Sequence, residues 1–81
     1  MGPRGLSYRD RAILRAVAGG TAQLVVSAEP DLFLDGRNCS DQMAAHRLAR
    51  AGLIVPTVSG DAGERVPAEL SVAGRELLLA S

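Results

Sequence analysis

SDQMAAHRLARAGL, residues 40–53, predicts a short helix that ends at a glycine and leads directly into a strand. Ser40 is placed to cap this helix, and Asp41 in its first turn complements the positive end of the helix dipole. Gly52 supplies the C-terminal stop. On a wheel of about 100° per residue, one narrow stripe is apolar and is expected to be buried: Ala44, Ala45, Leu48 and Ala51.

The opposite face of this predicted helix, residues 41–51, is polar and basic. It carries Met43, His46 and Arg50, with Gln42 and Arg47 on its two shoulders. Every formal charge after Asp41 in this helix is positive, although the charge of the whole chain sums to zero. Guanidinium groups can neutralise phosphates and read guanine edges, so this face is a candidate DNA contact. The alternative is an ordinary solvated helix face.

The residues after this helix predict two strands and a last helix. Residues 53–55 and 65–70 favour strands, and the glycine-rich residues 59–63 favour a loop between them. Pro67 suggests that the second strand lies at a sheet edge, because proline cannot donate to a ladder. Ser71 is placed to cap a helix over residues 72–80.

The residues before helix 41–51 predict an N-terminal arm, a first helix and a segment whose structure is ambiguous. Residues 1–6, including Arg4, are expected to form a loose arm, and residues 7–81 a single domain. Ser7 and Asp10 have the spacing of a capping box at the start of a helix over 8–18. The side of this helix expected to be buried carries Ile13, Ala16 and Val17, with Leu14 on its flank.

Residues 21–38 allow two interpretations. The apolar runs 24–26 and 32–34 favour strands, and the Pro30-Asp31 pair between them favours a turn, so a hairpin is expected. A short helix over 21–29 is the competitor, because brief apolar runs are ambiguous by periodicity alone. Asp35-Gly36 marks a turn before the next element.

Two further segments carry a family resemblance. HRLARAGLI, residues 46–54, followed by AELSVAGRELL, residues 68–78, resembles the recognition-helix-to-wing segment of MarR-type and ArsR-type bacterial regulators. The resemblance covers residues 40–80 and implies an α+β winged-helix domain. In order, it would hold a helix, a hairpin or short helix, a recognition helix, a two-stranded wing and a C-terminal helix. Those families place another helix where residues 21–38 favour strands.

The resemblance implies a small DNA-binding protein, a transcriptional regulator. Helix 41–51 would enter the major groove, and wing 58–66 would approach the backbone or minor groove. Gln42 could pair with adenine and Met43 could touch a thymine methyl. The expected DNA contacts are Gln42, Met43, His46, Arg47 and Arg50, with Arg65 on the wing.

A protein partner is the alternative. Acidic residues gather in segment 29–35, which we expect to face away from DNA or to meet a basic partner: Glu29, Asp31 and Asp35. Leu77, Leu78 and Leu79 are consecutive, so a single surface cannot bury all three, and they are candidates for a homodimer contact. The same fold would then be a protein-interaction module that acts on a transcription protein or another host protein.

The composition argues against several other classes. We expect no enzyme and no cofactor. Cys39 is the only cysteine, so it excludes an internal disulfide and fits a reducing cytoplasm. With His46 it supplies only two ligands of a structural zinc site, and a buried cysteine is the simpler interpretation. No apolar run approaches the roughly 20 residues of a membrane helix, and residues 1–10 lack a signal-peptide core.

Overall fold

The first helix, α1 (Tyr8–Ala18), begins at the predicted residue. In the computed structural model, which describes residues 6–80, the Asp10 N–H donates to the Ser7 hydroxyl oxygen at 3.0 Å and caps the helix. Four side chains of α1 are buried: Asp10, Ile13, Leu14 and Val17. Ala16 was expected among them but is exposed, because the buried side is centred closer to Leu14. Gly20, with φ +96°, lies just beyond the helix end.

Residues 21–38 form strands, and the competing helix is absent. Strand β1 (Ala22–Val25) pairs antiparallel with β2 (Leu32–Leu34), so the predicted hairpin is confirmed. A third strand, β3 (Arg37–Asn38), was not predicted. It pairs antiparallel with β2, and the turn Asp35-Gly36 connects the two strands. The φ values of 54° and 80° at these residues suit the tight hairpin turn that an Asp-Gly pair favours.

Helix α2 (Gln42–Arg50) is capped by Asp41, and the prediction that Ser40 is the cap was wrong. The Asp41 carboxylate accepts from the Ala44 N–H at 3.0 Å, the reach that a cap has to the third helical residue. Gly52 has φ +79° and ends the helix as predicted, because its N–H and that of Leu53 satisfy two of the last carbonyls. Ala51, expected in the buried stripe, is exposed at the C-cap.

The five strands form one antiparallel sheet in the order β3-β2-β1-β5-β4. Strands β4 (Ile54–Pro56) and β5 (Arg65–Leu70) lie near their predicted positions. The prediction that Pro67 marks an edge was wrong, because β5 lies between β1 and β4. Pro67 lies one residue beyond the Pro56–Ala68 pair, where the β4 ladder ends, and its carbonyl accepts from the Thr57 N–H at 2.9 Å.

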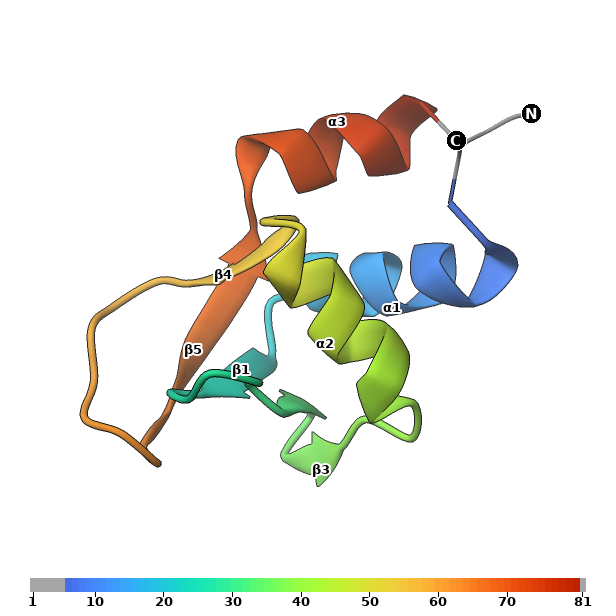
Figure 1. Cartoon of the computed structure of the whole chain (residues 1–81). Coiled ribbons are helices and arrows are strands. Elements are labelled where there is room, and N and C mark those ends of the chain that lie inside the picture. Colours follow the sequence, from blue (N-terminus) through green and yellow to red (C-terminus); the bar gives the residue numbers. More distant parts are fainter. Residues whose placement is uncertain (1–5, 81) are drawn as a thin grey trace.

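Helix α3 (Val72–Ala80) packs against the core through Leu78 and approaches the backbone of Leu53 closely at Gly74. Ser71 caps it as predicted, accepting from the Gly74 N–H at 3.0 Å and donating to the Gly52 carbonyl at 2.6 Å. Gly74 lies so close to the Leu53 carbonyl that a Cβ atom there would collide with it. Figure 1 shows α3 crossing one end of the molecule.

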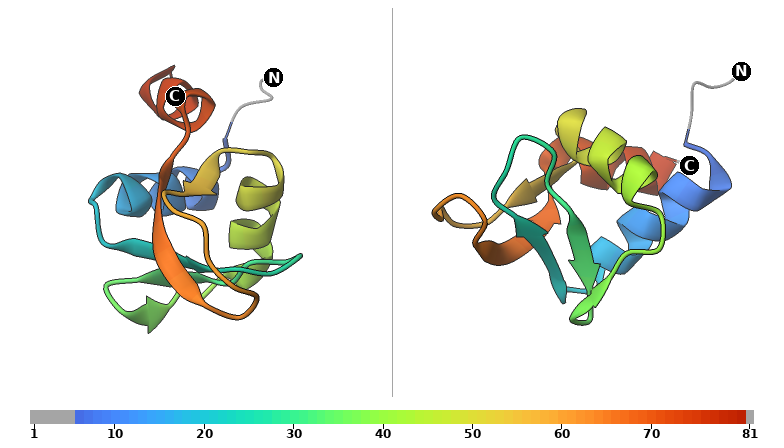
Figure 2. Two further views of the ribbon diagram at one scale, coloured as in Figure 1. Left: turned by 90° about the vertical axis from the view of Figure 1, so that its left-hand side faces the viewer. Right: turned by 60° about the horizontal axis from the view of Figure 1, so that its bottom comes forward.

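The core lies between helices α1 and α2 and one face of the sheet (Figure 2). Strand β5 alternates strictly: Val66, Ala68 and Leu70 are buried, and Arg65, Pro67 and Glu69 are exposed. Leu6, expected in the loose arm, packs against the core, and Arg4 lies outside the described residues. The predicted α+β order is therefore confirmed over residues 6–80. None of the helices in this range is long and apolar enough to span a membrane.

Candidate binding surfaces

Three predicted contacts lie on the outer side of α2. Met43 is 80% exposed, and the side chains of Arg47 and Arg50 are 61% and 69% exposed. With Glu29 and His46 they line a shallow hollow of about 340 Å³. The amphipathic pattern of the sequence therefore predicted correctly which side of α2 faces outward.

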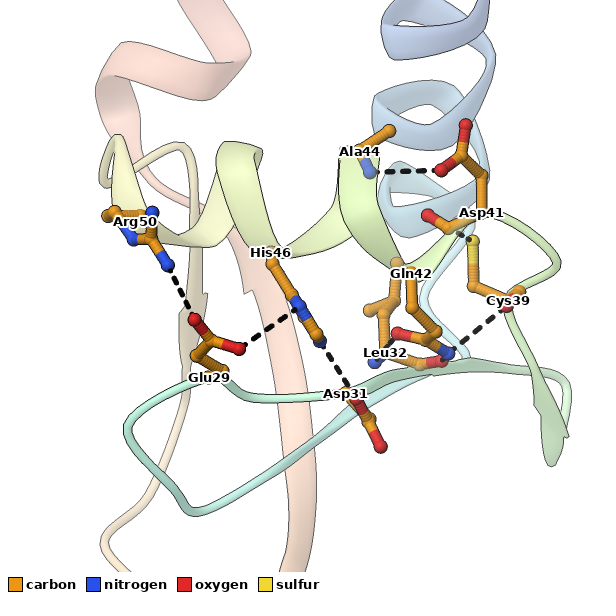
Figure 3. A network of polar contacts seen from close by, with 9 residues as sticks. All are labelled: Glu29, Asp31, Leu32, Cys39, Asp41, Gln42, Ala44, His46 and Arg50. Atoms are coloured by element: carbon orange, nitrogen blue, oxygen red, sulfur yellow. Dashed lines mark hydrogen bonds and ion pairs between the residues drawn. The ribbon is translucent and has the colours of Figure 1, made fainter.

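Gln42 does not belong to this outer side. Its amide accepts from the Leu32 N–H at 2.9 Å and donates to the Leu32 carbonyl at 2.9 Å and the Cys39 carbonyl at 3.1 Å. Figure 3 shows the side chain directed toward the β2 backbone. The side chain ties α2 to the sheet, so the expectation that it reads adenine does not fit this geometry.

The acidic part of the β1–β2 hairpin lies against the basic side of α2. Figure 3 shows His46 and Arg50 pointing toward Glu29 and Asp31. His46 Nε2 is 2.8 Å from the Asp31 carboxylate, and Arg50 donates to Glu29 at 3.1 Å. His46 Nδ1 is 3.9 Å from Glu29. The acidic segment was expected to face away from DNA or to meet a basic partner, but Glu29 and Asp31 pair with the chain's own cations.

Arg47 is paired on the other side of α2. Its guanidinium donates to the Asp10 carboxylate at 2.7 Å, across the interface between α1 and α2. Asp10 is only 9% exposed, whereas the Arg47 side chain is largely exposed. Asp10 was predicted only to help cap α1, and an acid on the buried side of a helix is the signal that could have revealed a partner.

The start of α2 carries a related ion pair. Arg9 donates to Asp41 at 2.8 Å. The Ala44 N–H and then the Arg9 side chain hold the pKa of the Asp41 carboxyl below its ordinary value. Asp41 thus joins α1 to α2 while it caps α2.

Arg65 lies away from the α2 surface. Its guanidinium carbon is 3.8 Å from the centroid of the Phe33 ring, a cation–π contact between β5 and β2. Since Val66 faces the helices, Arg65 lies on the opposite face of the sheet. In the neighbouring loop Glu64 accepts from the Asp61 N–H at 2.9 Å, so the wing adds acids.

The surface predicted to meet DNA is consequently not cationic. In its helix, Arg47 and Arg50 lie among the carboxylates of Asp10, Glu29 and Asp31, a formal excess of one negative charge. On the predicted wing, which is a separate surface, Arg65 is accompanied by Asp61 and Glu64. A helix whose own charges are positive is compensated by residues that lie far away in the sequence.

Cys39 is buried, as expected, and is 7% exposed. Its thiol lies 3.8 Å from the Asp41 carbonyl. Across residues 6–80, no group of three or more His, Cys, Asp or Glu side chains is arranged to hold a metal ion.

The C-terminal leucines lie on a second surface. Leu77 and Leu78 are half-buried, Leu79 is 82% exposed, and Val72 is 73% exposed. Beside them a groove of about 320 Å³ runs between the end of α1, β5 and α3. It is lined by Val17, Ala18, Gly20, Ala68, Glu69, Leu70, Arg75, Leu78 and Leu79. The sequence predicted the leucines but missed Glu69 and Arg75, and the alternation of β5 is the signal that could have placed Glu69 outward.

Comparison with known proteins gives no relative: no family model, no curated protein and no solved structure matches this chain.

Proposed function

We propose that this chain is a protein-interaction module with a winged-helix architecture, whose contact surface is α3 and the groove beside it. The architecture is supported by the order α1, β1, α2, β4, β5 and by the position of β5 between β1 and β4. The β2–β3 hairpin would replace the helix that ordinarily precedes a recognition helix.

We favour a protein partner over DNA because of the charge of the α2 and wing surfaces. DNA affinity comes largely from cations that neutralise phosphates and release counterions. Here Arg47 and Arg50 already pair with carboxylates, and Glu29 and Asp31 would lie close to the DNA backbone. Like charges placed together across an interface oppose binding, so these acids disfavour DNA at this surface.

The α3 surface has the opposite character. It exposes Val72 and Leu79, and a groove with apolar side chains on its walls lies beside them. Exposed apolar side chains next to a groove are typical of protein contacts, whereas scattered single ones need no explanation. The acidic hairpin, the other protein-binding surface expected from the sequence, is less suited because Glu29 and Asp31 pair with cations of α2 and Asp35 accepts from the Thr21 hydroxyl.

A titration with DNA tests this proposal. A labelled mixed-sequence duplex is titrated with the chain at about 50 mM and about 200 mM salt, and its fluorescence anisotropy is followed. We expect no salt-sensitive binding at micromolar protein. Binding by the unmodified chain that is weakened by Arg47→Ala together with Arg50→Ala would overturn the proposal.

A DNA-binding transcriptional regulator is the second candidate, and one observation favours it. The Arg50 and Glu29 side chains are 69% and 64% exposed, and exposed ion pairs contribute only about 0–1 kcal/mol. A phosphate could therefore displace Glu29. If so, Glu29→Gln together with Asp31→Asn should produce measurable duplex binding with a salt slope steeper than that of the unmodified chain. Under the protein-interaction proposal this variant does not bind either.

A further inference from the structure

Helix α3 is short, and most of its side chains are at least partly exposed. It has nine residues, and Gly74 is its one buried residue. Isolated helices shorter than about 12–15 residues are marginal in water, so a helix of this size depends on tertiary contacts. Two large apolar side chains of α3, Val72 and Leu79, are exposed, and Leu77 and Leu78 are half-buried.

The surface around α3 offers both a projecting side chain and a groove to receive one. Leu79 projects at the rim. The groove is walled by Val17 on α1, Leu70 on β5 and Leu78 on α3. A patch that carries both parts can be complementary to a copy of itself, which is the requirement for a two-fold interface.

The charges at this groove are also self-complementary. Glu69 and Arg75 both line it, yet they do not form an ion pair with each other among the described residues. The Arg75 guanidinium donates to the Leu70 carbonyl at 3.3 Å, which holds it near the rim. A two-fold axis would bring Glu69 of each copy toward Arg75 of the other.

We propose that this chain forms a two-fold dimer through α3, in which Leu79 of each copy enters the groove of the other. Glu69 of one copy then pairs with Arg75 of its partner. The inference rests on the proposed function, because it names a second copy as the protein that the α3 surface binds. It would cover the two large apolar side chains of α3 that stay exposed in a single chain.

The size of the surface sets the expected strength. A standard interface buries about 800 Å² of each partner, roughly one sixth of the 4943 Å² accessible surface of this chain. A nine-residue helix with one groove is a small contact. We therefore expect a dissociation constant in the micromolar range and a dimer that dissociates on dilution.

Analytical ultracentrifugation of the full chain, from low micromolar to near-millimolar concentration, tests the inference. We expect a reversible monomer–dimer equilibrium. Leu79→Glu should raise the dissociation constant at least about tenfold, because it places a charge in an apolar contact. Val58→Glu is the matched control, since Val58 is also exposed, at 53%, but lies in the wing loop.

Charge reversal supplies a second, independent test. Glu69→Arg and Arg75→Glu should each weaken the dimer, and the double variant should restore it, because the two charges are exchanged. A chain that remains monomeric at every concentration would overturn the dimer. So would a dimer that Leu79→Glu leaves intact, or reversals whose effects simply add. These outcomes leave the DNA titration unaffected, so the proposed function and its partner can fail separately.

Discussion

Helices α2 and α3 both present exposed side chains, but the cations of α2 have partners within the chain and two large apolar residues of α3 are left uncovered. On α2, His46, Arg47 and Arg50 each have a carboxylate partner from another part of the chain. On α3, the exposed side chains include Val72 and Leu79, two large apolar residues that the chain leaves uncovered. The basic face of α2, which the sequence marked as the binding surface, has its charges neutralised within the chain. The face of α3 leaves apolar side chains exposed to water.

This comparison shows that an exposed side chain is not always free to bind a partner. Arg50 is 69% exposed and Leu79 is 82% exposed, so exposure alone does not distinguish them. An arginine must exchange one ion pair for another when it binds a new anion, and the gain is small. A leucine that leaves water gains free energy in proportion to the buried area, about 25 cal/mol per Å².

The largest effect should come from the close approach of Gly74 on α3 to the Leu53 backbone. In most helices Gly→Ala is favourable by about 1 kcal/mol. Gly74→Ala should instead destabilise the chain by about 3 kcal/mol, because the added Cβ atom meets the backbone of Leu53, which cannot move freely. Urea denaturation measures the change, with Glu76→Ala on the exposed side of α3 as the control. Stability equal to or above that of the unmodified chain would show that α3 is not held at this point.

The two arginines of α2 should differ in their contribution to stability. Arg47→Ala removes the partner of a nearly buried carboxylate, so we expect a loss of about 1–2 kcal/mol in the free energy of unfolding. Arg50→Ala breaks an exposed pair and should cost less than about 0.5 kcal/mol. Thermal or urea denaturation of both variants provides the comparison. Equal losses would mean that Asp10 does not depend on Arg47.

These contacts also show which features could be predicted from sequence. Helix α1, the β1–β2 hairpin, β5 and α3 were predicted because local signals specify them, including the capping serines Ser7 and Ser71 and the alternation of β5. The position of the cap of α2 was wrong by one residue, because Ser40 and Asp41 are both good caps and only the backbone path decides between them.

The partners of the α2 cations could not be predicted in the same way. Asp10 lies 37 residues from Arg47, and Glu29 lies 21 residues from Arg50. Such pairs depend on how the helices and the hairpin pack, which no local pattern specifies. The inward direction of Gln42 has the same origin, because the one donor and two acceptors that it meets are backbone groups of Leu32 and Cys39. The opposite charges of segment 29–35 and helix α2, and the position of Asp10 on the buried side of α1, were the available hints.

The smallest expected effect on stability comes from the charge of Asp41, which caps the N-terminus of α2 and whose contribution changes with pH. The Asp41 pKa is lowered in the folded chain, first by the Ala44 N–H and then by Arg9. A carboxyl with a lowered folded pKa stabilises the fold above its unfolded pKa and loses that contribution as pH falls through the folded value. Asp41→Ser is the matched variant, since serine can still cap the helix but does not titrate.

The measurement is the free energy of unfolding of both chains from pH 7 down to pH 3, at low and at high salt. The advantage of the unmodified chain over Asp41→Ser should be constant near neutral pH and should shrink as pH falls below the ordinary value of 3.8. Salt should reduce the part that comes from Arg9, because that pair is exposed, but not the part that comes from the backbone N–H. If the difference in the free energy of unfolding between the two chains does not change with pH, the Asp41 charge does not stabilise the capped N-terminus of α2.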